Sequence, residues 1–299
     1  MKLETRKKQK SCLVCGGRLD KVLLNITQPD RFEKAAGISG KYLRRWVECS
    51  ACGTAVNIMA ADVERALSKI SSSYYKHEFK TGAMLKERFD KVMGFPPESS
   101  DNYHRVRRIE GFISRYRVAE KAKPALLDVG AGMGVFLSVF QKKNGSVWKA
   151  CGMEPDPMAA QHLRSISKNR FSVTESMLED HKPGRRKYRL CTLNKMLEHI
   201  KKPVDFLKKI NRLLEDDGFV YVELPDKLTI GNRPSTDNIL GALHHYLFGI
   251  MGMEILLNRA GFVPLSIERE FEPSEKISVY AFAAKAGAVK KLVGIKVKS

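Results

Sequence analysis

The 299-residue sequence contains no long apolar run that is free of charge. Its longest apolar stretch, residues 239–257, is interrupted by His244, His245 and Glu254, which predicts a packed helix and argues against a membrane span. The charged N-terminus is not followed by an apolar core, which argues against a secretory signal. Internal repeats and low-complexity segments are also absent. Together these absences favour a cytoplasmic globular chain with one large α/β domain and a small extra module.

Cysteines are scarce, and four of the six form two matching pairs. Cys12 and Cys15 form one Cys-x2-Cys hook and Cys49 and Cys52 the other, with a glycine after each hook. Four thiolates can surround one zinc ion tetrahedrally at roughly 2.3 Å. Two disulfides would suit a reducing cytosol poorly, and a second hook disfavours a redox motif. We therefore predict a structural Zn2+ site in a zinc-ribbon-like module at residues 1–60, with a hairpin or helix between the hooks.

A glycine-rich turn follows the apolar run that ends in Asp128. Glycines stand at positions 130, 132 and 134, and an apolar helical pattern begins directly after them. Glycine lets the backbone bend sharply and lets a ligand approach it closely. Dinucleotide sites use G-x-G-x-x-G, with the pyrophosphate at the helix N-terminus. Here the preceding acid would repel a pyrophosphate and suits a ligand with a cationic amino group. A strand-turn-helix connection without a ligand is the alternative.

This Asp-x-Gly-x-Gly-x-Gly pattern resembles that of the class I S-adenosylmethionine (SAM) methyltransferases. The resemblance implies a doubly wound, Rossmann-like α/β sheet at residues 101–286 and SAM as the cofactor. Glu154 lies 20 residues beyond Gly134, at the end of a second short apolar run, where the fold places its ribose-binding carboxylate. The cofactor-binding residues implied are Asp128, Gly130, Ala131, Gly132, Gly134, Glu154, Pro155, Met177 and Asn194.

Residues 189–223 predict a strand at 189–193, an amphipathic helix at 203–214 and a strand at 219–223. The resemblance places Asn194 near the methionine part of the cofactor and Glu198 and His199 at the rim of the active site. An Asp that relatives often carry at the start of the first of these strands is missing here. Cys151 and Cys191 lie inside strand patterns and are predicted core residues.

The remaining elements flank this pattern. Residues 61–100 predict a helical linker with an amphipathic segment at 62–70, in which Tyr74 and Tyr75 either extend over the substrate or pack in the core. A helix begins near Asp101, capped by that residue or by Ser100. This helix is predicted to bury one apolar stripe: Val106, Ile109, Phe112 and Ile113. We also predict the first strand at 125–129, the final strands at 263–269 and 276–285, and a basic tail at 287–299.

Two histidines follow a loop after Pro225 that is long enough to act as a lid. Related enzymes that methylate sugar carbons carry a Glu-His pair here. In this chain Leu243 or His244 occupies the Glu position, which disfavours carbon methylation. A general base assists transfer to a hydroxyl, and the candidates are His199, His244 and His245, with Glu198 orienting one of them or binding the substrate. A purely structural hydrogen bond is the alternative for each histidine.

The formal net charge of +20 favours an anionic partner. Basic clusters lie at residues 2–10, 105–117, 182–189 and 285–298. The partner could be a nucleotide-linked sugar, a phosphorylated glycan, nucleic acid, or an anionic membrane surface touched by the C-terminal tail. A solvated basic surface is the alternative. No aromatic RNA-binding stretch is present, and the loop after Asn194 lacks the Pro-Pro pattern of many base-methylating enzymes.

The Asp101-Asn102-x-x-Arg105 element before the glycine turn resembles the corresponding segment of zinc-hook methyltransferases from surface-sugar and polysaccharide gene sets. That likeness implies SAM-dependent methyl transfer to a small-molecule or glycan acceptor, with a sugar hydroxyl favoured. The enzyme would mainly align the reacting atoms, roughly 3–3.5 Å apart. Two alternatives remain: an RNA methyltransferase that uses the basic surface, and a non-catalytic SAM-fold scaffold that binds proteins through the zinc module.

Overall fold

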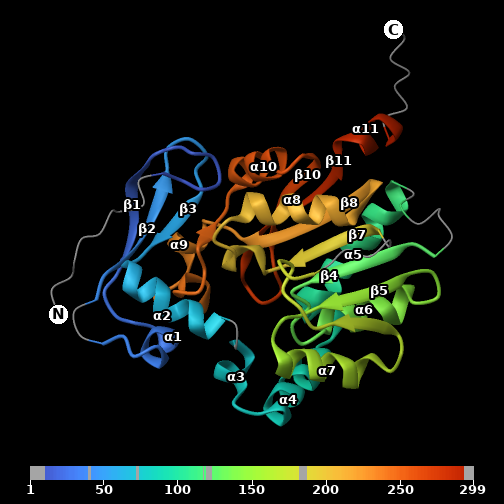
Figure 1. Ribbon diagram of the computed structural model, residues 1–299, viewed down its shortest axis with the longest axis horizontal. Helices are drawn as coiled ribbons and strands as arrows, with labels where there is room; N and C mark the ends of the chain where they lie inside the picture. Colours follow the sequence, from blue (N-terminus) through green and yellow to red (C-terminus); the bar gives the residue numbers. More distant parts are fainter. Residues whose placement is uncertain are drawn as a thin grey trace, which may run out of the picture.

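A seven-stranded mixed sheet dominates the computed structural model, which describes residues 11–39, 42–71, 74–116, 118, 123–181 and 187–292 (Figure 1). The strand order is β10-β11-β8-β7-β4-β5-β6, with β4 to β8 parallel and β11 antiparallel to β8. The strands are β4 (Ala125–Val129), β5 (Lys149–Met153), β6 (Phe171–Thr174), β7 (Tyr188–Asn194), β8 (Leu214–Pro225), β10 (Phe262–Phe271) and β11 (Ile277–Lys285). This sheet confirms the predicted doubly wound, Rossmann-like fold.

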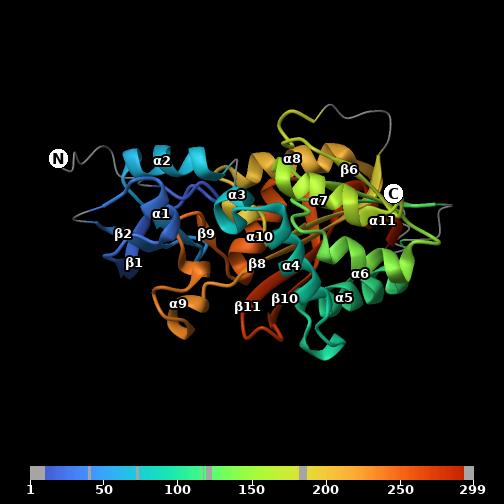
Figure 2. The ribbon, with the colours of Figure 1, turned by 90° about the horizontal axis from the view of Figure 1, so that it is seen from below.

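Helices cover both faces of this sheet. The stripe Val106, Ile109 and Phe112 of α5 (Asp101–Arg115) packs with α6 (Val135–Asn144) and α7 (Pro157–Ser167) on one face. The apolar face of α8 (Pro203–Leu213) packs with α10 (Ile250–Arg259) on the other. Figure 2 shows α8 on the side opposite α5 and α6. Each helix therefore buries the stripe that its sequence period predicts.

Several predicted boundaries agree with the structure. The predicted strand at 125–129 matches β4, and the side chain of Ser100 caps α5 by accepting a bond from Tyr103 N at 3.3 Å. The final strand pair is present as β10 and β11. The strand predicted from residue 219 begins earlier, because the β8 backbone already pairs with β7 at Leu214.

The helix predicted over residues 239–257 is wrong. A 3-10 turn (Asn238–Leu240) and a short strand, β9 (Tyr246–Leu247), come first, and α10 begins only at Ile250. Gly241 and Gly249 divide the stretch, and pairing of β9 with another strand replaces helical hydrogen bonds. Tertiary pairing thus overrides the apolar pattern.

A second, four-stranded sheet contains the two cysteine hooks. Its order is β1-β2-β3-β9, from β1 (Leu19–Ile26), β2 (Arg44–Cys49) and β3 (Ala55–Ile58). Strand β1, helix α1 (Arg31–Ala35) and most of strand β2 lie between the hooks. Because β9 comes from the C-terminal third of the chain, the orange strand completes a blue sheet in Figure 1.

Further helices and turns complete the described fold. They are α2 (Ala61–Ser71), α3 (Tyr74–Phe79), α4 (Gly82–Met93) and the 3-10 turn Pro97–Ser99 before the large sheet, and the 3-10 turn Leu197–His199, α9 (Thr229–Asn232) and α11 (Ala286–Leu292) within or after it. Helix α2 matches the predicted segment at 62–70.

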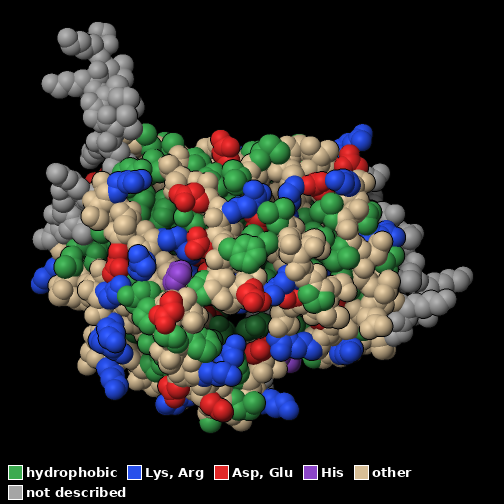
Figure 3. All heavy atoms as spheres, turned by 180° about the vertical axis from the view of Figure 1, so that it is seen from behind, with side chains coloured by type: hydrophobic (Ala, Val, Ile, Leu, Met, Phe, Trp, Pro, Cys, Tyr) green, Lys and Arg blue, Asp and Glu red, His purple; other side chains and the backbone are tan. Residues whose placement is uncertain are grey.

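Charges are intermixed on the surface. Figure 3 shows lysine and arginine side chains scattered among acidic ones on one face. Three of the four predicted basic clusters lie wholly or partly outside the described residues. These are the cluster at 2–10, residues 182–186 of the cluster at 182–189, and residues 293–298 of the cluster at 285–298. Within the described part, every helix is too short or too polar to cross a bilayer.

Candidate active site and metal centre

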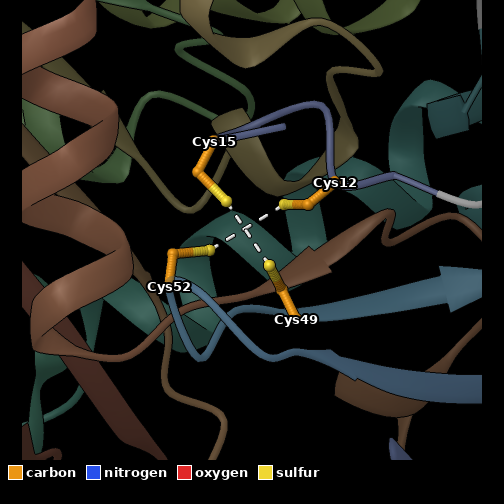
Figure 4. Close-up of side chains that lie close together, drawn as sticks. All are labelled: Cys12, Cys15, Cys49 and Cys52. Atoms are coloured by element: carbon orange, nitrogen blue, oxygen red, sulfur yellow. Dashed lines mark hydrogen bonds between the residues drawn. The ribbon is translucent and has the colours of Figure 1, made fainter. Parts of the chain in front are cut away.

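The four hook cysteines converge on one point (Figure 4). The Sγ atoms of Cys12 and Cys52 are 3.9 Å apart and those of Cys15 and Cys49 3.4 Å apart. A disulfide would need about 2.05 Å. Tetrahedral thiolates at roughly 2.3 Å from a zinc ion are about 3.8 Å apart. The spacing therefore excludes disulfides here and fits a four-cysteine metal centre, with Gly17 N donating to Cys15 Sγ at 3.3 Å.

The turn after β4 requires its three glycines. Gly130, Gly132 and Gly134 have φ angles of 71°, 57° and 78°, which side chains rarely adopt. A Cβ would also collide with Met196 at Gly130, with the Tyr75 hydroxyl at Gly132 and with Leu163 at Gly134. The glycine pattern thus reflects both backbone conformation and close packing around the turn.

Asp128 lies buried at the end of β4 beside this turn. Its Oδ1 accepts hydrogen bonds from Thr192 Oγ1 at 2.7 Å and Asn194 Nδ2 at 2.8 Å. Burial raises the pKa of Asp128 to about 7, although both hydrogen bonds oppose the rise. Asn194 Oδ1 is buried and has no hydrogen-bond partner among the described residues. The pair offers acceptor oxygens that suit a cationic amino group.

Glu154 follows β5 and is held against the glycine turn. Its Oε2 accepts from Gly132 N at 2.8 Å and its Oε1 from Asp156 N at 3.0 Å. Burial raises the pKa of Glu154 to about 7. The Tyr75 hydroxyl lies against Gly132 and lines the adjacent cavity at this point. Glu154 therefore lies behind the cavity wall, next to Tyr75.

Apart from Glu154, most of the predicted cofactor-binding residues line one cavity, and two do not. Gly130, Ala131, Gly132, Gly134, Asp128 and Asn194 line the cavity. Pro155 and Met177 are not among its described lining residues, and Met177 is 45% exposed. The structure thus gathers the glycine turn and the two strand-end polar residues at one cavity.

This cavity has a volume of about 720 Å³ and combines residues from the whole chain. Arg31 and Phe32 of α1 form one wall with Tyr74 and Glu78 of α3. Tyr74 and Tyr75, for which the sequence allowed either a core position or a position over the substrate, therefore both line the cavity. Five further lining residues that no local motif marks were missed from the sequence: Arg31, Phe32, Lys195, Arg233 and Lys276.

Cations in this cavity are mostly paired with acids. Arg31 pairs with Glu78 at 2.6 Å, and Arg233 pairs with Asp237 at 3.1 Å. Lys276 is different: burial lowers its pKa, with Asp101 and Glu272 opposing that effect. The cavity therefore offers both hydrogen-bond acceptors and cationic donors to a polar ligand.

His199 and His244 meet edge to face, with ring centroids 4.6 Å apart. His199 Nδ1 is 3.1 Å from Leu243 O, and His244 Nδ1 is 2.7 Å from Ile239 O. A carbonyl can only accept, so Nδ1 carries the proton in both rings and Nε2 keeps a free lone pair. Burial lowers the pKa of His199 to about 4 and that of His244 well below its usual range. Both imidazoles are therefore neutral at physiological pH.

Glu198 completes a group of three with these histidines. Its side chain is buried, its Oε2 has no hydrogen-bond partner among the described residues, and burial raises its pKa to about 8. Ligand atoms of the three residues all lie within 4.8 Å of one another. Two imidazoles and a carboxylate at this spacing can exchange a proton or hold a divalent cation.

His245 lies apart from this group. It is not one of the described residues that line the cavity, and the charged groups near it are Glu64 and Lys201. The structure brings Glu198, His199 and His244 together and leaves His245 outside.

Comparisons with known proteins show the family. A family described as "Methyltransferase domain" matches residues 102–267, more than half of the chain. The "Ubiquinone biosynthesis O-methyltransferase" of Vibrio vulnificus (strain YJ016) is 26% identical over 156 residues, 52% of this chain and 60% of that relative. The protein of the same name in Vibrio parahaemolyticus is 24% identical over the same lengths. The matched segment thus spans about 60% of these curated relatives.

Solved structures share the fold. A plantazolicin methyltransferase in complex with a desmethyl analogue and S-adenosylhomocysteine has a TM-score of 0.54 at 13% identity, covering 73% of this chain and 96% of that one. The magnesium protoporphyrin IX methyltransferase of Synechocystis PCC 6803, with bound S-adenosylhomocysteine, has a TM-score of 0.53 at 12% identity, covering 73% and 100%. At such identities the likeness establishes the fold alone.

Proposed function

The chain belongs to the methyltransferase-domain family, and on that premise we propose that it transfers a methyl group from SAM to a hydroxyl of a small-molecule or glycan acceptor, with a nucleotide-linked sugar as the first choice. The observation that carries this proposal is the His199–His244 pair. Both rings hold a backbone carbonyl through Nδ1 and line the same cavity as the glycine turn. A hydroxyl is less acidic than a thiol and therefore needs such a base more than a sulfur nucleophile does.

The residues at the turn fit the cofactor's groups. Asp128 and Asn194 would hold the amino group through their acceptor oxygens, and Glu154 would accept from ribose hydroxyls once Tyr75 leaves room. Arg105, which lines the same cavity, offers a guanidinium to the carboxylate. When bound, SAM supplies a methyl group activated by the sulfonium.

His244 acts as the base in this proposal. The proton of the acceptor hydroxyl would pass to His244 Nε2 as the acceptor oxygen takes the methyl group that SAM supplies, with S-adenosylhomocysteine as the leaving group. Glu198 lies close enough for its carboxylate, the form that prevails above its pKa of about 8, to stabilise the imidazolium that forms. His199 keeps its own Nδ1–H on Leu243 O and presents a second neutral ring to the acceptor.

The walls support a polar acceptor that carries negative charge. Asp237 and Asn238 offer hydrogen-bonding groups for sugar hydroxyls, and Phe32 and Tyr74 offer apolar ring faces. Arg31, Arg233 and Lys276 offer donors to phosphate or carboxylate. The matched relatives are named as O-methyltransferases, which agrees with an oxygen acceptor.

The cysteine centre is proposed to hold a structural Zn2+. Four sulfur ligands leave no open position for a substrate or a water molecule. Its chemistry would therefore be confined to holding the turns that carry Cys12, Cys15, Cys49 and Cys52 together.

An acceptor screen tests the proposal. Purified protein is incubated with SAM and, in separate reactions, nucleotide-linked sugars, catechol-type phenols or bulk RNA, and S-adenosylhomocysteine is measured with the mass of the methylated product. We expect oxygen methylation of a sugar. Methylation of RNA that weakens steeply with salt would replace the glycan proposal with the nucleic-acid one. Folded protein that binds SAM but modifies none of the three classes would favour a scaffold.

A further inference from the structure

Residues 238–247, here called the histidine segment, are held largely by the N-terminal part of the chain. The cysteine module is defined as residues 11–58, with the four hook cysteines, α1 and strands β1 to β3. Strand β9, at the end of the histidine segment, pairs with β3 through Ala55–Leu247 and Val56–Tyr246. His244, which lines the cavity, lies two residues before this paired stretch, so module and cavity meet close to this residue.

Asn57 on β3 binds the segment at three points. Its Nδ2 donates to His244 O at 2.7 Å and to Gly241 O at 3.3 Å, and its backbone N donates to His245 O at 2.9 Å. The side chain is nearly buried, at 5% exposure. An asparagine in the middle of a strand therefore fixes the backbone on both sides of the His244 ring.

Arg44 and Asp30 hold the preceding turn. Arg44 is 1% exposed and its Nη1 donates to Leu240 O at 2.7 Å. Asp30 Oδ2 accepts from Ala242 N at 2.7 Å. Since Arg44 is also near Glu33 Oε1 at 3.4 Å, its buried charge is compensated within the module.

The His244 ring depends on this same backbone. Its Nδ1 donates to Ile239 O, the residue next to the carbonyl that Arg44 holds. His199 depends on it too, because its Nδ1 donates to Leu243 O. The tautomer and the orientation of both rings are therefore set by carbonyls in a segment that the cysteine module fixes.

The metal centre is connected to Asn57 through a short turn. Cys49 ends β2, and its N–H binds Thr54 O at 2.9 Å, while Gly53 N binds Cys49 O at 2.9 Å. Cys52 Sγ lies 3.2 Å from Thr54 Oγ1, just before β3 begins. Holding Cys49 and Cys52 on one ion would fix the alignment of β2 with β3, and so the positions of Arg44 and Asn57.

We propose that the cysteine module is a positioning element of the methyl-transfer site, in which Asn57 orients the His244 ring and the metal-bearing turn holds Asn57. This inference rests on the proposed function, in which His244 is the base. It differs from a purely stabilising role, because it predicts that module variants alter the rate of transfer through His244 and leave cofactor binding intact.

A double-mutant cycle tests the proposal on the full-length, metal-loaded protein. Asn57→Ala should lower kcat by about 10–100-fold, since a small misplacement of a reacting group costs that much, and should change the Kd for SAM less than twofold. The double variant Asn57→Ala/His244→Gln should be no slower than His244→Gln alone, because both changes act on one group. Additive losses, or an equal loss of SAM affinity, would overturn the proposal.

Asn25→Ala is the matched control. Asn25 belongs to the same module, and its Oδ1 accepts from Arg45 Nε at the exposed end of β1. This variant should keep the wild-type kcat. A comparable loss in Asn25→Ala would show that any damage to the module slows the enzyme, and would overturn the specific role of Asn57.

Imidazole nitrogen spectra separate this inference from the proposed function. The His244 signals, assigned by their loss in His244→Gln, should shift in Asn57→Ala and after a chelator removes the metal, whereas those of His162, on α7, stay unchanged. If His244→Gln transfers methyl groups as fast as wild type, the proposed function fails, and the spectra still test the positioning. Unchanged His244 signals in both samples would overturn the positioning role.

Discussion

Arg105 on α5 and Glu223 on β8 form a two-pronged ion pair inside the protein. Arg105 Nε donates to Glu223 Oε2 at 2.8 Å, its Nη2 donates to Oε1, and its Nη1 donates to Asn102 Oδ1 at 2.8 Å. Burial alone would raise the pKa of Glu223, but Arg105 and Lys195 outweigh it and hold that pKa well below its usual range. The pair joins the helix before β4 to the strand end beside the cavity.

Replacing Arg105 with Met should therefore destabilise the fold. The change leaves the Glu223 carboxylate buried, with Arg108 Nη2 at 2.8 Å as a remaining partner, so we expect a loss of roughly 3 kcal/mol in the free energy of unfolding. Urea unfolding measures it. Arg107→Met, an exposed neighbour on the same helix, should change the value by less than about 0.5 kcal/mol. Equal effects of the two variants would show that the buried pair has no special weight.

Cofactor binding should release protons near neutral pH. Burial raises the pKa of Asp128 to about 7, so part of this carboxyl is protonated at pH 6.5 and must ionise to pair with an amino group. The affinity for SAM should accordingly rise between pH 5.5 and 8. Calorimetry in buffers of different ionisation enthalpy measures the released protons.

Asp128→Asn is the matching variant. It should abolish the pH dependence that Asp128 contributes and weaken binding by about 10–100-fold, because a charge-assisted bond is lost. Asp205→Asn, at an exposed position in the first turn of α8, should bind as wild type does. An affinity that stays flat with pH in wild type would contradict an Asp128 that titrates near neutrality.

The sequence was most informative where a chemical requirement is local. Three glycines with positive φ can be recognised because few other residues adopt those angles, and two cysteine hooks can be recognised by their spacing alone. Strand β4 and helix α5 were predictable for the same reason, since each carries its own hydrophobic period and the helix its own cap.

Contacts between distant segments were not predictable in this way. Nothing near Tyr246 indicates that it pairs with Val56, and this pairing is what converts a predicted helix into β9. The same pairing decides which of two adjacent histidines faces the cavity. Arg31 and Phe32 likewise reach the site only because the second sheet packs beside the first. A single sequence carries no local signal for such neighbours.

Metal analysis should find one zinc equivalent per chain in protein that is kept reduced. The four sulfurs are already gathered, so removal of the ion with a strong chelator should lower Tm by several degrees, because binding energy at such a site is folding energy. Cys191→Ala is the control: Cys191 is buried in β7, away from the hooks, and should leave the zinc content at one. Less than half an equivalent in wild type would exclude this metal centre.

Methyl transfer should persist at unusually low pH if His244 is the base. Only a neutral imidazole can accept a proton, and burial lowers the pKa of His199 to about 4 and that of His244 well below its usual range. As pH falls, the active form is therefore lost at a lower pH than the value near 6.5 at which an exposed histidine would lose it. Profiles of kcat/KM against pH measure this limb.

Three variants complete this prediction. His244→Gln should lower kcat by about 10²–10⁴-fold, the usual contribution of a general base, and His245→Gln, outside the cavity, should keep the wild-type rate. Burial raises the pKa of Glu198 to about 8, so its carboxylate forms as the pH rises and then stabilises a protonated imidazole beside it. Glu198→Gln should therefore remove any gain in rate above pH 8. Stimulation of the wild type by added divalent cations would point to a metal held by Glu198, His199 and His244, since a base that acts alone needs none.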